Sequence, residues 1–110
     1  MKISSNLCVV YCNTDSEENA KLISDHLVQN KIAACVSIFT NVLSVFEWND
    51  KMHHRNEFTM MIKTHKENLN KLESTILDLH PDTVPEIISV AIQDVHEPYQ
   101  DWILSTIKRE

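Results

Sequence analysis

The side chains of this chain that could bind a transition metal are its three cysteines and six histidines. No two cysteines form a CxxC pair, which argues against a structural zinc site and a thioredoxin-like redox site. An odd number of cysteines at these spacings builds no disulfide framework, so we expect a reducing compartment. A thiolate together with an imidazole would suit Cu(I), Cu(II) or Zn(II). His80, which precedes a proline, is the candidate for such chemistry that the sequence pattern itself indicates.

His80 stands in the segment LHPDTVPEII, between a helical pattern and a strand-like run. In one interpretation it only ends the helix, because a residue before proline is pushed out of the helical region. In the other, Pro81 and Pro85 hold its imidazole still in an exposed loop, where it can bind a metal. Cys12 is likewise either a small residue that closes a strand or a ligand. Two protein ligands are too few for tight binding, so any metal should bind weakly and be released as the pH falls.

The other polar candidates have simpler interpretations. His53 and His54 are adjacent on an expected strand and would point to opposite faces, so they should not chelate one ion. Glu57, Lys63 and Glu86 could form an ion pair or line a cleft between subunits. The isolated histidines His26, His65 and His96 are expected at the surface. Cys8 and Cys35 are expected in the core.

The absence of whole motifs limits the possible functions. The chain has no glycine, so it contains neither a GxGxxG motif nor a phosphate-binding P-loop. It also shows no Ser/His/Asp arrangement with a glycine-supported oxyanion loop. We therefore expect a binding protein without enzymatic activity.

Composition and charge are those of one ordinary globular domain covering residues 1–110, with 43% apolar and 24% charged residues. Sixteen acidic and ten basic residues give a net charge of −6, and the basic residues are scattered. Nucleic acids and anionic membranes attract concentrated positive charge, so neither is an expected partner. The longest apolar run, residues 32–36, is far shorter than the ~20 residues of a membrane helix. The N-terminus lacks the pattern of a signal peptide, and we expect a cytoplasmic location.

Hydrophobic periodicity predicts seven elements in the order βαββαβα. The expected strands cover residues 3–12, 33–48, 52–64 and 85–93, and the expected helices run from a capping box at Thr14 or Asp15 to about Asn30, from Lys66 to Leu79, and from Pro98 onward. Alternation on the first strand places Val10 and Cys12 on one face. This order is typical of the ferredoxin-like α+β fold, in which a four-stranded antiparallel sheet carries two helices on one face.

The two middle strands should form a long hairpin that turns at residues 49–51. Because glycine is absent, turns that need a positive φ must use Asn or Asp, and the candidates are Asn13, Asn30, Asn41 and Asn49-Asp50. Residues 42–62 contain more apolar ribbon than a small sheet needs. Such an excess predicts that neighbouring subunits cover the hairpin.

Five segments in order and spacing resemble the CutA family of divalent-cation tolerance proteins, and together they span most of the chain. They are KIAACVSI (31–38), SVFEWNDK (44–51), EFTMMIKT (57–64), HPDTVPEII (80–88) and YQDWI (99–103). The resemblance implies a compact homotrimer of ferredoxin-like subunits, similar in architecture to the PII signalling proteins, in which the long hairpins pair between subunits. It also implies copper binding at the positions of Cys12 and His80, with Leu79 standing where some members carry a second histidine.

Three functions are open, of which the resemblance favours the first. The first is a homotrimer that binds copper or another divalent cation weakly and acts in the response to metal ions. The second is a PII-like signalling trimer that binds a small anion or metabolite in the cleft between subunits. The third is a structural trimer that anchors another protein.

Overall fold

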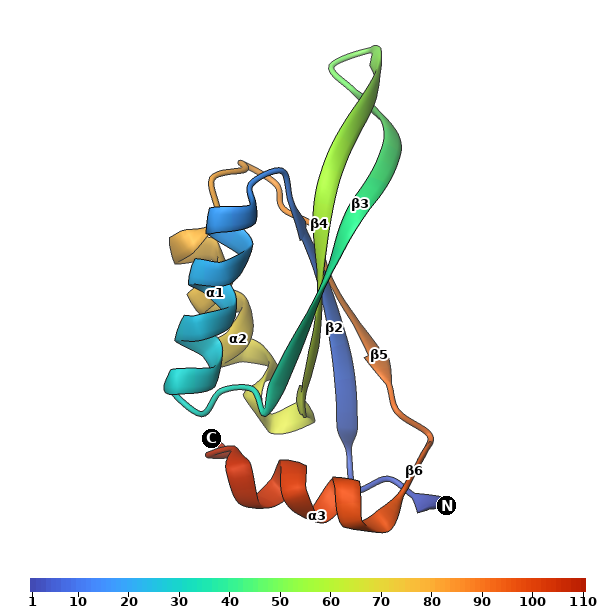
Figure 1. Cartoon of the computed structure of the whole chain (residues 1–110), viewed down its shortest axis with the longest axis vertical. Coiled ribbons are helices and arrows are strands. Elements are labelled where there is room, and N and C mark those ends of the chain that lie inside the picture. The colour runs from blue at the N-terminus through green and yellow to red at the C-terminus, as the bar shows by residue number, and fades with distance from the viewer.

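The computed structural model describes residues 1–110 and has the predicted α+β architecture (Figure 1). A four-stranded antiparallel sheet has the order β3-β4-β2-β5. Its strands are β2 (Leu7–Thr14), β3 (Cys35–Trp48), β4 (Lys51–His65) and β5 (Ile87–Ala91). The helices are α1 (Glu17–Gln29), α2 (Leu69–Leu79) and α3 (Glu97–Thr106). Helices α1 and α2 cover one face of the sheet, and α3 lies at the end where both termini are found (Figure 1).

Three short elements were not predicted. Strands β1 (Lys2–Ile3) and β6 (Asp94–Val95) pair with each other, and the 3-10 turn η1 (Lys66–Asn68) precedes α2. Two-residue strands carry no periodic signal, so the sequence pattern cannot reveal them. The predicted helix start at Lys66 is three residues early, because η1 occupies that segment.

Two predicted boundaries are wrong for local reasons. The cap of α1 is Ser16, whose hydroxyl accepts a hydrogen bond from the Asn19 N–H at 3.1 Å. Thr14 cannot serve as the cap, because it is the last residue of β2 and pairs with Phe58. The last strand covers only Ile87–Ala91 of the predicted 85–93. Proline at position 85 has no N–H to donate to a sheet.

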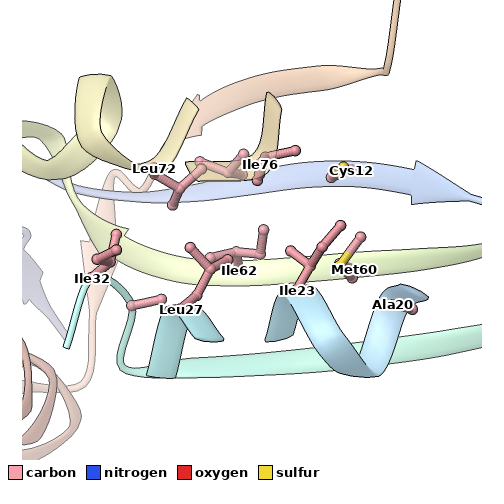
Figure 2. Packing of buried hydrophobic residues seen from close by; sticks show 11 residues of the cluster. Cys12, Ala20, Ile23, Leu27, Ile32, Met60, Ile62, Leu72 and Ile76 are labelled. Atoms are coloured by element: carbon pink, nitrogen blue, oxygen red, sulfur yellow. The ribbon is translucent and has the colours of Figure 1, made fainter. Parts of the chain in front are cut away.

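The main core lies between the sheet and the helices α1 and α2 (Figure 2). Val10 and Cys12 point into it from β2, as the alternation predicts. Ile23 and Leu27 meet them from α1, and Ile76 comes from α2. A second, smaller cluster lies at the α3 end and contains Leu7, Ala34, Val95, Ile103 and Ile107. The position of Cys12 in the main core is important for the functional site described below.

Without glycine, the chain makes its tight turns with other residues at positive φ. Asn41, Asn49 and Asp50 adopt φ between 54° and 62°, as predicted for the bend of β3 and for the hairpin turn. Asn41 lies where the register between β3 and β4 shifts. The predictions for Asn13 and Asn30 are wrong, because Asn13 lies within β2 and Asn30 has φ −91°. The positive φ after α1, 58°, falls instead on Lys31, although lysine has no special tolerance for this region.

Replacing Lys31 by glycine should therefore stabilise the protein. The Lys31 N–H and the Ile32 N–H close α1 on the carbonyls of Val28 and Leu27, in the motif that usually has glycine at this position. Glycine keeps these backbone bonds and removes the clash of Cβ, so we expect a gain of ~0.5–1 kcal/mol in the free energy of unfolding. Lys21→Gly, on the exposed side of α1, is the control and should cost ~1 kcal/mol. Denaturant unfolding measures both, and a loss for Lys31→Gly would contradict the prediction.

The hairpin of β3 and β4 extends beyond the ends of the other two strands, β2 and β5, and beyond the helices α1 and α2 (Figure 1). Its outer half exposes large apolar side chains, and so does the sheet face opposite α1 and α2. They include Phe39, Leu43, Val45, Trp48, Met52, Ile88 and Val90. Leu43 is 60% exposed and Ile88 is 53% exposed, so this surface is apolar and uncovered in a single chain.

Candidate functional site

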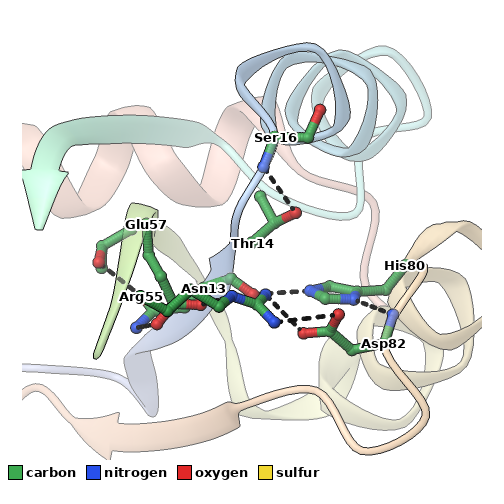
Figure 3. A network of polar contacts seen from close by, with 8 residues as sticks. Asn13, Thr14, Ser16, Arg55, Glu57, His80 and Asp82 are labelled. Atoms are coloured by element: carbon green, nitrogen blue, oxygen red, sulfur yellow. Dashed lines mark hydrogen bonds and ion pairs between the residues drawn. The ribbon is translucent and has the colours of Figure 1, made fainter. Parts of the chain in front are cut away.

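His80 follows the last residue of α2 and is held by two hydrogen bonds (Figure 3). Its Nδ1 accepts the backbone N–H of Asp82 at 3.0 Å, so Nε2 carries the proton and donates to the Asn13 carbonyl at 2.6 Å. The imidazole is therefore neutral, and both ring nitrogens are occupied. His80 is only 8% exposed. The expectation of an exposed loop histidine is wrong, because the ring packs against the end of β2.

Cys12 is completely buried in the main core (Figure 2). Burial, and then the negative charges of Glu86, Asp82 and Glu57, raise the pKa of its thiol to about 12. A thiol with such a pKa is protonated at physiological pH, whereas a metal needs the thiolate. The environment of Cys12 therefore favours its role as a small core residue.

The structure brings Cys12 and His80 to the same end of β2, since His80 bonds to the neighbour of Cys12. As arranged, however, the two side chains do not fit a metal ion. His80 has no free lone pair, Cys12 has no path to solvent, and no group of three His, Cys, Asp or Glu side chains is placed to hold an ion. Copper binding by this pair would require the two side chains to rearrange.

The inertness of Cys12 can be measured by alkylation. We expect iodoacetamide at pH 8 to leave Cys12 unmodified in the folded protein, because the sulfur is buried and its pKa is far above this pH. Unfolding in guanidinium should make it react at the rate of an ordinary thiol. Peptide mass spectrometry follows each cysteine, and Cys8, which is also buried with a raised pKa, is the internal reference. Rapid labelling of native Cys12 would make the copper prediction structurally plausible again.

The other candidates from the sequence are dispersed. His65 is buried and its Nδ1 accepts the Glu67 N–H at 3.0 Å, so its predicted surface position is wrong. Cys35 is only partly buried, outside the predicted core position, and the ammonium of Lys63 lies 3.7 Å from its sulfur. Lys63 also donates to the Ser37 hydroxyl at 2.7 Å and makes no ion pair with a carboxylate.

Arg55 is a residue whose importance the sequence analysis missed. From β4 it reaches Asp82 in the loop after His80, with Nη2 2.8 Å from Oδ2 (Figure 3). Its Nε lies 3.2 Å from Oε2 of Glu57, but the N–H does not point along a hydrogen bond, so this contact is an ion pair. Glu57 Oε1 also accepts a 3.3 Å bond from Asn13. The network ties the hairpin to β2 and to the loop before β5. Arg55 and Glu57 are two residues apart and therefore share a strand face. This spacing was the signal in the sequence that could have indicated their ion pair.

A cavity of about 680 Å³ opens beside this network. Its lining combines the charged residues Arg55, Glu57, Asp82 and Glu86 with aromatic rings nearer the hairpin turn, including Trp48. None of the four ion pairs in the chain involves Glu86. Partial burial, and then the charge of Glu57, raise the pKa of Glu86. Three carboxylates therefore face the cavity with one guanidinium, which is already shared by two of them.

A second cavity, of about 500 Å³, lies between α1, α2 and the C-terminal residues 108–110. Its charged lining carries both signs, with Lys71, Lys108 and Arg109 against Asp78 and Glu110. The polar core residue beside it, Asn68, has its hydrogen bonds made within the chain. This cavity is therefore a weaker candidate site than the one beside Arg55.

The fold and the elongated hairpin define a class: ferredoxin-like α+β subunits with an extended central hairpin. The chain belongs to the CutA1 divalent ion tolerance protein family, whose family model matches residues 8–106. No helix of the chain has both the length and the apolar character needed to cross a membrane.

Individual relatives agree with this assignment. The chain is 35% identical over 95 residues to the divalent-cation tolerance protein CutA of Thermus thermophilus, covering 86% of this chain and 92% of that protein. It is 33% identical over 101 residues to a CutA homolog of Xenopus laevis, covering 92% of this chain and 67% of that protein. The solved Cut A1 structure from Thermus thermophilus superposes with a TM-score of 0.90 at 32% identity, covering 93% and 99% of the two chains.

Proposed function

We propose that the chain assembles as a cytoplasmic homotrimer that acts in divalent-cation tolerance. The observation that supports assembly is the apolar surface on the hairpin and on the sheet face opposite the helices. A monomer would leave this surface, and the edges of β3 and β5, in contact with water. The role in tolerance is supported by family membership and by the names of the relatives.

Light scattering tests the assembly. We expect a mass of three times the 12.8 kDa of one chain at micromolar concentration. The double variant Leu43→Lys/Val45→Lys places charges on the exposed hairpin and should lower the mass toward that of one chain. Leu22→Lys, at a similarly exposed leucine on α1, is the matched control and should leave the mass unchanged. A parent protein with the mass of one chain would refute the trimer.

In this proposal the trimer binds copper weakly. Because Cys12 and His80 do not fit a metal as they are arranged, we expect tolerance not to depend on tight coordination by this pair. Calorimetric titration of the reduced protein with Cu(II) and Zn(II), beside Cys12→Ser and His80→Ala, tests this directly. We expect binding that is weak and unchanged in both variants. Saturation near one ion per chain that both variants abolish would show that the pair rearranges into a metal site.

A second candidate function is favoured by the cavity beside Arg55. Its lining extends along the hairpin from Glu57 to Trp48 beside the turn, and its volume is in the range of small-molecule sites. The chain would then sense a small molecule, as a PII-like signalling trimer does. A thermal-shift screen that finds stabilisation by organic compounds and none by metals would favour this function over the first.

A further inference from the structure

We infer that the cavity beside Arg55 binds a small organic cation, an amine or ammonium compound with an apolar body. This inference rests on the second candidate function and names its class of ligand. It does not require Cys12 or His80 to bind anything.

The charge of the cavity selects a cation over an anion. Glu57, Asp82 and Glu86 contribute three carboxylates, and Arg55 is the only lysine or arginine in the lining. Arg55 is itself engaged by Glu57 and Asp82, so it has little capacity to attract an anionic ligand. The Glu86 carboxylate has no cationic partner within the chain. A ligand ammonium group beside it would supply the missing partner.

Glu57 adds a buried negative charge to the same wall. Its side chain is only 9% exposed, yet its contacts are loose: a 3.3 Å bond from Asn13 and an unaligned ion pair with Arg55. A carboxylate this buried with such long contacts is incompletely compensated. The raised pKa of Glu86 is consistent with this, since the charge of Glu57 contributes to it.

The part of the lining nearer the hairpin turn selects an organic body over a bare metal ion. It contains Trp48, Phe46 and His53, and the last two rings stack with centroids 5.5 Å apart. Aromatic faces attract organic cations, and Val84 adds aliphatic surface. A metal would instead need three or more converging ligand side chains, and the chain presents no such group.

The test uses phenethylamine as the probe on the full chain. Its matched compounds are phenylacetate, which is anionic, and 2-phenylethanol, which is neutral. The chain has two tryptophans, so a Trp102→Phe background leaves Trp48 as the only indole, and its fluorescence reports on the cavity. We expect phenethylamine to change this fluorescence saturably and to bind at least about tenfold more tightly than either matched compound, the factor that one charge-assisted hydrogen bond supplies.

Variants connect the binding to the proposed residues. Glu86→Gln keeps the shape of an exposed side chain that has no partner to lose, so the fold should be intact by circular dichroism. We expect it to weaken phenethylamine binding about tenfold. Glu47→Gln removes an exposed carboxylate next to Trp48 that does not line the cavity, and it should leave the affinity unchanged.

Three results would overturn the inference. They are the absence of a response to phenethylamine, tighter or equal binding of phenylacetate, and equal effects of Glu86→Gln and Glu47→Gln. A response to Zn(II) that depends on Glu86, without a response to the amine, would also overturn it and would assign the cavity to an inorganic ion. The mass of the assembly is measured separately, so failure of the trimer can be distinguished from failure of this site.

Discussion

Replacing Arg55 by methionine is expected to lower the free energy of unfolding by ~2–4 kcal/mol. The guanidinium pairs with Glu57 and Asp82, and its loss leaves the Glu57 carboxylate buried without a cation. Removal of one partner of a fully buried pair costs ~3–5 kcal/mol, and the value here is lower because the Arg55 side chain is 28% exposed. Urea unfolding of parent and variant measures the difference.

Two further variants separate lost charge pairing from lost packing. Arg55→Met/Glu57→Gln removes the stranded charge as well and should recover a large part of the loss. Lys21→Met breaks the exposed pair with Glu17 and should change stability by less than about 0.5 kcal/mol. If Arg55→Met were as mild as Lys21→Met, the network would not contribute to the stability of the hairpin base. An Arg55→Met variant of unchanged stability would also count against the proposed ligand cavity, because Arg55 forms part of its wall.

Replacing Asn68 by alanine is expected to cost ~2–3 kcal/mol, because it removes three hydrogen bonds made by a buried side chain. The Asn68 amide donates to the carbonyls of Ile32 and Lys108, and its oxygen accepts the Glu110 N–H. These bonds have lengths of 3.0–3.1 Å and join three distant segments at a side chain that is 1% exposed. Hydrogen exchange should show the loss first at residues 108–110.

Asn70→Ala is the matched control for Asn68→Ala. Asn70 lies two residues later on the exposed side of α2, so its replacement should change stability by less than about 0.5 kcal/mol. Equal effects of the two variants would contradict the role of Asn68 as a link between the chain ends and α2. Global destabilisation without faster exchange at residues 108–110 would show that its bonds to the C-terminal residues are dispensable.

Both variants concern side chains whose importance was not visible in the sequence. Arg55 and Asp82 are 27 residues apart, and Asn68 lies about 40 residues from Lys108. Periodicity reports which face of an element a residue occupies, whereas pairing across such distances depends on how the elements pack. The spacing of Arg55 and Glu57 indicated a shared strand face but not the loop that joins them.

The sequence by itself determined the βαββαβα order, the long hairpin, the inward face of β2 and the family. These features follow from local alternation, turn residues and ordered motifs, each of which acts within a few residues. Only the tertiary structure decided the states of Cys12 and His80. The Asn13 carbonyl, 67 residues from His80, occupies one ring nitrogen, and the core seals Cys12. Burial and hydrogen bonding decide whether a side chain is a ligand, and both are set by segments far away in the chain.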